Sequence, residues 1–316
     1  MIMVSALRKI LALAIIIFVV GFLWGGAQNI INENNTPKTL STNIDILHKK
    51  IIDDSVAKDR EDIEKASINS ILENMYVEVS LLASALPNIA NPSVTYLRIT
   101  QGMRKEQIAN ILGNNLSWDK TEETKFLATE IPEKSISGEG YFYPGTYLFR
   151  KENSGELAGR LMTGRFKQEV LTRYASSTNK VINLDTALKI ASILEREAGG
   201  KYDMRIISGI IWNRMFKGMS LDMDSTLQYA KGNEEIGWWP KVESEDKFID
   251  SPYNTYANEG LPPTAIANPS ILAIEAALNP KKTNCLFFLH DKKGGFHCTK
   301  TYKEHSANIK RFYVVK

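Results

Sequence analysis

The strongest constraint on the fold of this chain is the run LKIASILEREAG at residues 188–199, which has the spacing of a core helix. Two carboxylates, Glu195 and Glu197, close the run before Gly199 and Gly200 stop the helix. An acidic group on a helix that packs against a core is costly unless it is paired or functional. This helix end is therefore the first place to look for an acid catalyst.

The two carboxylates cannot share one role, because residues two apart on a helix point about 200° away from each other. Glu195 lies beside the small residues Ala191 and Ser192, which should leave room for a bulky substrate, whereas Glu197 lies over larger apolar residues. We therefore predict that Glu195 is the acid and keep Glu197 as the alternative. A helix C-terminus raises the pKa of a carboxyl group, as a general acid requires. The plainer interpretation is that both are surface carboxylates.

The N-terminus predicts a membrane anchor. Arg8 and Lys9 precede a charge-free apolar run at residues 10–27. A membrane span needs about 20 apolar residues, whereas the core of a signal peptide has about 7 to 15. Because the positive residues come first, we expect residues 1–9 to form a cytoplasmic tail and the rest of the chain to be exported. A cleaved signal peptide is the alternative.

The composition indicates a folded protein without a nucleic-acid role. The chain has 316 residues, of which 43% are hydrophobic and 24% are charged, as in globular proteins large enough for two domains. A net charge of +3 without a long basic cluster gives no footprint for nucleic acid. Cys285 and Cys298 either pair outside the cytoplasm or are buried separately. No spacing of Cys and His resembles a zinc site, so we expect neither a metal nor an organic cofactor.

The exported part divides into three regions. Residues 28–92 read as a flexible tether and a helical stalk. Residues 93–135 read as a small unit, with a strand at 94–100, a glycine turn, and a short helix that ends at residues 113–115. Residues 136–316 read as mainly helical with a small antiparallel sheet, which makes the fold class α+β. The predicted elements of this last region are helices at 157–174, 184–198, 205–216, 270–278 and 303–312, a further helix after residue 224, and strands at 286–290 and 296–299.

Aromatic residues gather in two loops. The loop at residues 138–147 sets tyrosines and a phenylalanine among glycines, and could present rings to a sugar. Core aromatics in a turn are the plainer interpretation of that loop. Trp238 and Trp239 lie in a long loop at residues 232–250. We expect one of them to stack on a glycan and the other to cap a core.

Four blocks in the right order resemble the MltG/YceG-like endolytic murein transglycosylases. The block with the most specific pattern begins with Tyr-Asn-Thr-Tyr and continues through Gly-Leu-Pro-Pro to an Asn-Pro pair. The resemblance covers roughly residues 94 to 312. The blocks are residues 190–197; residues 213–221 with 224–226; residues 253–256, 260–263, 266–269 and 279–280; and residues 294–295, 301 and 304–305.

The resemblance implies a single-pass inner-membrane protein whose catalytic domain, residues 136–316, faces the periplasm or cell exterior after a LysM-like subdomain at 93–135. Family members cut nascent peptidoglycan strands internally between N-acetylmuramic acid and N-acetylglucosamine. They leave 1,6-anhydromuramoyl ends and help to terminate strand elongation. The family's catalytic Glu falls on Glu195. The implied partners are glycan strands, the membrane and, further, peptidoglycan synthases.

Substrate-binding candidates lie in two of these blocks. An Asn can bond an N-acetyl group and a Tyr can stack on a sugar ring. For the Tyr-Asn-Thr stretch, a purely scaffolding role is equally open. The candidates are Asp222, Asp224, Thr226, Tyr253, Asn254, Thr255 and Tyr256.

The chain departs from the family at two positions that bear on activity. Asp222 stands where Gln is usual, and Phe296 stands where a His is usual, with His297 shifted by one residue. A one-residue shift on a strand turns a side chain to the other face, so His297 is doubtful as a site residue. Two alternatives follow: a muramidase that uses water with Asp222 as a second carboxylate, and an inactive peptidoglycan-binding scaffold for division.

Overall fold

The computed structural model describes Leu40, residues 42–52, residues 94–129, Ile131, and residues 138–175 and 182–313. These residues all belong to one unit that begins at Leu40. The predicted tail, the predicted anchor at 10–27 and most of the predicted tether and stalk lie outside the described residues. None of the helices in the described ranges combines the length and apolarity needed to cross a membrane.

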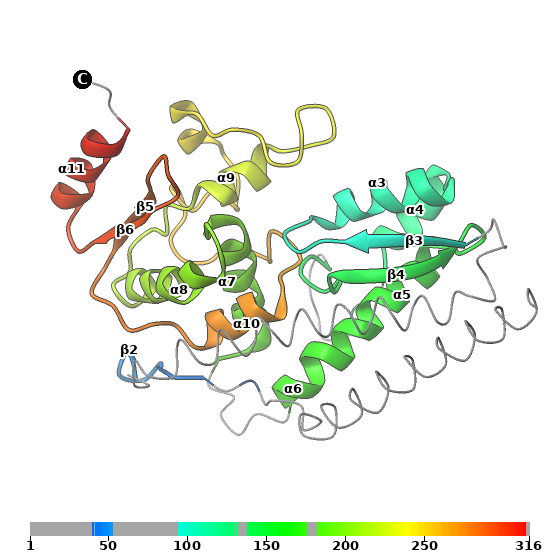
Figure 1. The fold of residues 1–316 in the computed structure, drawn as a ribbon, viewed down its shortest axis with the longest axis horizontal. Helices are drawn as coiled ribbons and strands as arrows, with labels where there is room; N and C mark the ends of the chain where they lie inside the picture. Colours follow the sequence, from blue (N-terminus) through cyan, green and yellow to red (C-terminus); the bar gives the residue numbers. More distant parts are fainter. Residues whose placement is uncertain are drawn as a thin grey trace, which may run out of the picture. The chain divides into compact units, whose positions relative to one another are not determined.

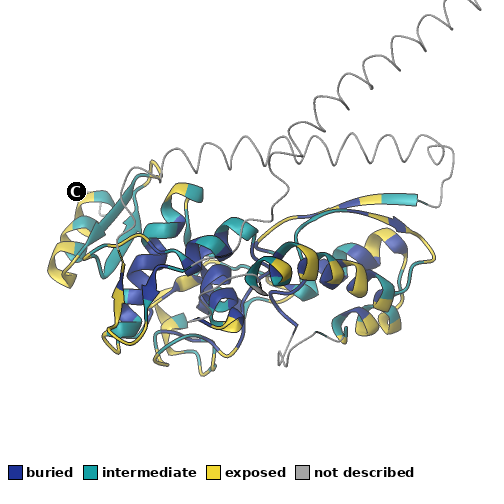
Figure 2. Ribbon diagram, turned by 90° about the horizontal axis from the view of Figure 1, so that it is seen from below, coloured by how far each residue is buried: buried dark blue, intermediate teal, exposed yellow. Residues whose placement is uncertain are grey.

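Helix α7 (Leu184–Glu197) lies at the centre of the larger core, where α8 (Lys201–Phe216) and α10 (Ile271–Leu278) pack against it (Figure 1). The side chain of Asn183 caps its start by accepting a hydrogen bond from the N–H of Thr186. Its apolar stripe is at most 1% exposed from Leu188 to Leu194, apart from the partly exposed Lys189. Figure 2 shows these buried residues gathered on the central helices. The predicted helix at residues 184–198 is confirmed to within one residue.

A second core belongs to a small α/β unit. Strand β3 pairs antiparallel with β4, so that Val94 faces Arg150 and Ile99 faces Gly145. The predicted boundary at residue 135 is therefore wrong, since it separates the two strands of one sheet. Tyr147 and Phe149 of β4 alternate inward and close the same core as β3. The elements of this unit are β3 (Val94–Ile99), α3 (Lys105–Leu116), α4 (Lys120–Leu127), β4 (Gly145–Arg150) and α5 (Gly155–Phe166).

Helix α3 continues past the predicted stop at residues 113–115. Gly113 is buried within the helix, and a Cβ added there would lie 2.9 Å from a carboxylate oxygen of Glu123 on α4. The glycine therefore permits close packing of two helices instead of ending one. The helix ends at Ser117, which adopts the left-handed conformation with φ of 57°.

The aromatic loop at residues 138–147 belongs to the core. Tyr141, Phe142 and Tyr147 are 5%, 1% and 8% exposed. Phe142 stacks on Phe126 with ring centroids 4.7 Å apart. The plainer interpretation of this loop is confirmed, and these three rings are not available as a sugar platform.

The described part of the predicted helical stalk is a short hairpin. Strand β1 (Ile44–Asp45) pairs with β2 (Lys50–Ile51), and Ile44 and Ile51 are buried in the larger core. Asn43 ties the hairpin to the end of α10 by donating to the carbonyl of Pro280 at 3.1 Å. The helical prediction was wrong for these residues because tertiary burial of two isoleucines outweighs the local pattern.

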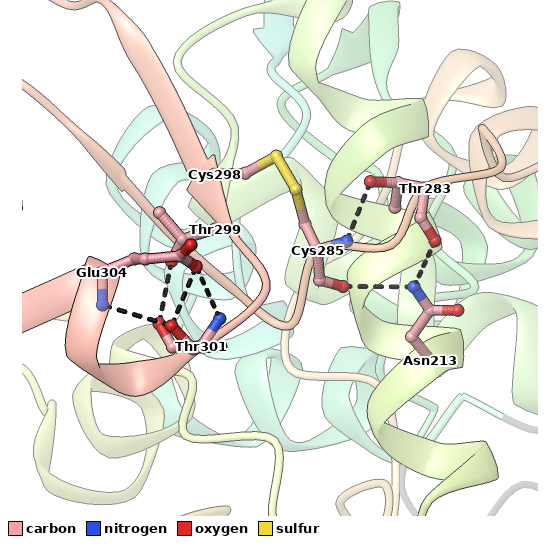
Figure 3. Close-up of a disulfide and its surroundings, with 7 residues drawn as sticks. All are labelled: Asn213, Thr283, Cys285, Cys298, Thr299, Thr301 and Glu304. Carbon is pink, nitrogen blue, oxygen red and sulfur yellow. Dashed lines mark hydrogen bonds between the residues drawn. A yellow bond between two sulfur atoms is a disulfide. The ribbon is translucent and has the colours of Figure 1, made fainter.

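The C-terminal hairpin confirms the predicted strands and settles the state of the cysteines. Strand β5 (Phe287–His290) pairs with β6 (Phe296–Thr299), and α11 (Tyr302–Phe312) follows. Cys285 and Cys298 form a disulfide, which Figure 3 shows beside α8. Asn213 of α8 donates to the carbonyls of Thr283 and Cys285 at 2.8 and 3.1 Å, which anchors the hairpin to the helical core.

The remaining elements agree with the predicted order. The predicted helix at 157–174 is α5 followed by a π-helical turn and a short helix, and the long loop at 232–250 contains one 3-10 turn. These elements are η1 (Lys167–Leu171), α6 (Thr172–Ala175), α9 (Asp224–Lys231) and η2 (Ser244–Phe248). The described chain is thus a mixed helical protein with small antiparallel sheets, consistent with the predicted α+β class.

Candidate active site

Glu195 faces the start of α10. Its Oε2 accepts hydrogen bonds from the N–H of Ser270 at 2.9 Å and from the hydroxyl of Ser270 at 2.7 Å. Ser270 is the N-cap of α10, and its hydroxyl also accepts from the N–H of Ala273. Burial raises the pKa of Glu195, while the hydrogen bonds from Ser270 and the charge of Arg196 lower it. Glu195 is therefore already engaged in holding a helix N-terminus.

The face of small residues beside Glu195 does not offer the expected room for a substrate. Ala191 and Ser192 are 0% exposed. The hydroxyl of Ser192 accepts from the N–H of Ile266 at 3.0 Å and donates to the carbonyl of Lys189 at 2.8 Å. The segment that leads into α10 occupies this face, so the expectation of an open space here is wrong.

Glu197 faces the start of α9 instead. Its Oε1 accepts from the N–H of Ser225 at 2.9 Å. The N-cap of α9 is Met223, which has no side-chain acceptor, so a carboxylate from another helix satisfies this N–H. Burial raises the pKa of Glu197; hydrogen bonding from Ser225 lowers it, the nearby Asp224 raises it and His290 lowers it. Glu197 thus takes the place of a side-chain cap from α9 itself.

Acidic and phenolic groups gather beside Glu197. The hydroxyl of Tyr256 donates to Oδ1 of Asp224 at 2.6 Å. Burial raises the pKa of Tyr256, and the charges of Asp224, Asp222 and Glu197 raise it further, which places all three carboxylates near this phenol. Asp222 is itself paired with the buried Arg214, with Oδ2 2.7 Å from Nη1. Neighbouring negative charge favours the protonated form of a buried carboxyl group.

Three of the predicted substrate-binding residues are buried. Thr226, Asn254 and Thr255 are 0%, 0% and 2% exposed. The hydroxyls of Thr226 and Thr255 lie 2.9 Å apart and join α9 to the 253–256 loop. Asn254 donates to the carbonyls of Lys247 and Ile249, which ties the loop to the end of η2. These side chains build the loop and do not form its surface, which corrects their predicted role.

Three other predicted residues, Asp224, Tyr253 and Tyr256, are at least partly exposed beside the site. Tyr253 is partly exposed, its hydroxyl lies 2.9 Å from that of Thr264, and its ring packs 4.7 Å from that of Tyr229. Asp224 is exposed and is reached by Tyr256. Asp224, Tyr253 and Tyr256 therefore remain able to touch a ligand beside Glu197, and Asp222 is exposed as well but is paired with Arg214.

The sequence reasoning missed His290 and Asp203. Nε2 of His290 lies 3.0 Å from Oδ2 of Asp203 and 3.3 Å from the backbone nitrogen of Gly199, directly after α7. The hairpin register sets His290 opposite Phe296, the position where a His had been expected. The neighbouring positions of His290 and Phe296 become visible only when the pairing of the two strands is known. His297 instead bonds Asp291 and stacks on Phe312, which agrees with its doubtful status.

Both tryptophans of the 232–250 loop lie against cations. The guanidinium of Arg196 lies 4.0 Å from the centroid of the Trp239 ring, and that of Arg104 lies 5.3 Å from the Trp238 ring. In the part of the chain that the structure describes, no group of three or more His, Cys, Asp or Glu residues is placed to hold a metal ion. The chemistry available at the end of α7 is therefore that of carboxyl, phenol, imidazole and guanidinium groups.

Comparison with known proteins gives consistent results. The profile of the YceG-like family matches residues 64–311. An endolytic murein transglycosylase of Bacillus subtilis is 31% identical over 263 residues, which cover 77% of this chain and 72% of that protein. One of Streptococcus pneumoniae is 30% identical over 174 residues, 54% of this chain but only 31% of that protein. A solved structure of a YceG-like protein from Listeria monocytogenes is similar with a TM-score of 0.60 and 29% identity, over 72% of this chain and 80% of that one.

Proposed function

The chain belongs to the YceG-like family, and we propose that it is an endolytic murein transglycosylase in which Glu197 is the proton donor. The observation that carries this proposal is the carboxyl group of Glu197 at the end of α7. It is half-buried, desolvation raises its pKa, and it lies among Asp224, Tyr256 and His290. A neutral carboxyl group in such a setting is suited to general acid catalysis.

The reaction needs one carboxyl group in two successive roles. Neutral Glu197 donates its proton to the oxygen that links N-acetylmuramic acid to N-acetylglucosamine, and the bond from C1 to that oxygen breaks. The 6-hydroxyl of the same N-acetylmuramic acid attacks C1, and its proton passes to the carboxylate of Glu197. The products are a 1,6-anhydromuramoyl end and a new N-acetylglucosamine end, with no water consumed.

Glu197 is preferred to Glu195 because of what each carboxylate already binds. The carboxylate of Glu195 accepts two hydrogen bonds from Ser270 at the start of α10, and the adjoining face of α7 is filled by the residues before α10. In Glu197, Oε1 accepts a hydrogen bond from the N–H of Ser225. This carboxyl group lies on the α9 side of α7, where Tyr256 donates to Asp224. Holding an acid by a backbone N–H fixes its direction, as a catalytic group requires.

A hydrolase that uses Asp222 as second carboxylate is not favoured. Asp222 is held by Arg214 at 2.7 Å, and its backbone is fixed in the left-handed region with φ of 51°. A retaining or inverting glycosidase needs a second carboxylate that is free to act as nucleophile or as base. In the transglycosylase reaction the substrate supplies the nucleophile instead.

The cellular setting forms part of the same proposal. Residues 10–27 would anchor the chain in the cytoplasmic membrane with the N-terminus inside, which leaves the catalytic part on the outer side. The small unit with β3 and β4 would act as a LysM-like glycan-binding module. An enzyme held at the membrane surface can reach strands as they are made, which is why peptidoglycan synthases are the expected partners.

The test is a product analysis with the full-length chain in a mild detergent. Purified uncrosslinked glycan strands are digested, and the new ends are identified by mass spectrometry before and after borohydride reduction. We expect ends that are one water lighter than a reducing sugar and that resist reduction. Reducible N-acetylmuramic acid ends would show hydrolysis instead, and intact strands would contradict any cleaving activity.

A further inference from the structure

Arg196 lies between the two carboxylates of α7 and forms no ion pair with them. We infer that the Arg196 guanidinium, resting on the ring of Trp239, binds a carboxylate of the peptide stems that murein strands carry. This inference rests on the proposed function and extends it, because it names the part of the substrate that is recognised and the residue that recognises it.

Each carboxylate beside Arg196 is committed elsewhere. Glu195 accepts two hydrogen bonds from Ser270, and Glu197 accepts one from Ser225. The Nε of Arg196 is shielded from solvent and has no acceptor among the described residues. No hydrogen bond or ion pair to its terminal nitrogens is formed within the same part of the chain. A half-buried guanidinium therefore keeps its charge and its donors unmatched, which is costly unless a ligand supplies acceptors.

Trp239 gives this cation a defined orientation. The guanidinium carbon lies 4.0 Å from the centroid of the indole ring, as in a stacked cation–π contact. The Nε1 of Trp239 is also buried without an acceptor among the described residues. The stacked pair thus contributes two buried N–H donors that lack acceptors among the described residues. A stacked guanidinium presents its edge to a ligand, and that edge matches the two oxygens of a carboxylate.

The turn of the small α/β unit closes one side of the guanidinium. Gly102 has φ of 78°, and a Cβ added there would lie 3.4 Å from Nη1 of Arg196 and 3.5 Å from Cγ of Glu195. These are ordinary contact distances, so the turn packs directly against Arg196, and the positive φ is what favours glycine at this position. The guanidinium therefore lies at the joint between the small unit and α7, one residue before the proposed acid.

The chemistry of the substrate identifies the ligand. The sugar rings of a murein strand are neutral and offer hydroxyl and N-acetyl groups. Its negative charges lie on the peptide stems that are attached to the lactyl group of N-acetylmuramic acid. A cation beside the acid that cuts next to N-acetylmuramic acid would therefore meet a stem carboxylate, and strands without that charge should bind less well.

The experiment compares two substrates with the full-length chain. One is a preparation of uncrosslinked strands with intact stems; the other is the same preparation after conversion of its carboxylates to methylamides, with the reagents removed. We expect the wild type to lose roughly 10- to 100-fold in kcat/KM on the blocked strands, mainly through KM. Arg196→Gln should lose the same factor on intact strands and should no longer distinguish the two. Arg160→Gln, which removes an exposed arginine on α5, should behave as the wild type does.

The outcomes separate this inference from the proposed function. If Arg196→Gln still discriminates as the wild type does, the stem carboxylate is not bound by this residue, although the transglycosylase assignment stands. If Arg196→Gln lowers kcat equally on both substrates with KM unchanged, the residue acts on the acid and the inference is overturned. Absence of anhydromuramoyl ends from the wild type on either substrate contradicts the proposed function itself. Arg196→Lys, which keeps the charge but not the planar fork, repeats the test with a smaller expected loss should the Gln variant fold poorly.

Discussion

The end of α7 has two sides that differ in what they do with a carboxylate. On the α10 side, Glu195 binds the backbone and hydroxyl of one serine and is packed against fully buried small residues. On the α9 side, Glu197 binds one backbone N–H and lies near Asp224, Tyr256 and His290. Burial raises the pKa of both groups, so a raised pKa alone does not separate a structural carboxyl group from a catalytic one. The other residues around each carboxyl group are what distinguish the two.

The largest expected effect on the cleavage rate comes from replacing Glu197, and it tests the difference between the two sides directly. Glu197→Gln keeps the shape and an acceptor for the N–H of Ser225 but cannot donate an acidic proton. We expect the rate of formation of anhydromuramoyl ends to fall by about 10²- to 10⁴-fold, the usual contribution of a general acid. Glu195→Gln is the matched control and should keep its rate within a few-fold. If Glu195→Gln loses more of the cleavage rate than Glu197→Gln does, Glu195 is the proton donor and the proposed assignment is wrong.

Glu139 provides a reference carboxyl group that is fully buried and lies outside α7. It is 1% exposed and accepts hydrogen bonds from the N–H of Lys105 and from Asn268, and burial raises its pKa to about 8. Its folded-state pKa lies above the unfolded value of 4.5, so its stabilising effect is complete below that value and is lost as the pH rises towards about 8.

We therefore expect the free energy of unfolding to fall with pH across this window, by up to about 5 kcal/mol in total. Glu139→Gln should remove this part of the slope while leaving the glycan-cleavage rate nearly unchanged. Denaturant titrations at a series of pH values measure it. An identical slope in the variant would mean that other groups, such as the two carboxylates of α7, carry the dependence.

The third prediction concerns the disulfide, which stabilises the hairpin that carries His290. Cys285 and Cys298 are 13 residues apart, and a crosslink that closes a loop of this size stabilises a protein by about 3 kcal/mol. Replacement of both cysteines by Ser should lower the free energy of unfolding by about that amount, as should reduction of the wild type. If neither treatment changes the stability, the bond is not formed in the folded protein.

The smallest effect concerns the α10 side. Ser270→Ala removes the N-cap hydroxyl and one of the two hydrogen bonds to Glu195, and should cost about 1 kcal/mol of stability. The cleavage rate should stay close to that of the wild type, because this side is structural. A rate that falls as far as in Glu197→Gln would break the distinction between the two sides.

Sequence reasoning located the helix end with its two carboxylates and preferred Glu195, whereas the contacts in the structure lead us to propose Glu197. Spacing shows that Glu195 and Glu197 face different directions, and the structure agrees. Spacing does not show what packs on the small residues beside Glu195. In the structure, the residues before α10 pack on them. A face of small residues predicts close approach, and whether a substrate or another segment approaches depends on tertiary contacts.

The fold was predictable where local signals are strong. Caps and glycines gave the helices and the final hairpin within a few residues. The pairing of β3 with β4 joins segments that lie on either side of two helices, and no local pattern specifies such a partner. The same holds for His290, whose position opposite Phe296 follows from hairpin register. The burial of Thr226 and Asn254, likewise, depends on contacts between loops.

The most direct test of the central claim is the pH dependence of kcat/KM for glycan cleavage, measured in the wild type and in Glu195→Gln. A protonated Glu197 is the active form, so the rate should be present below its raised pKa and should fall as the pH rises through it. We predict that Glu195→Gln keeps this fall at the same pH, while Glu197→Gln has too little activity to show it. A fall that disappears in Glu195→Gln, together with an active Glu197→Gln enzyme, would contradict the account.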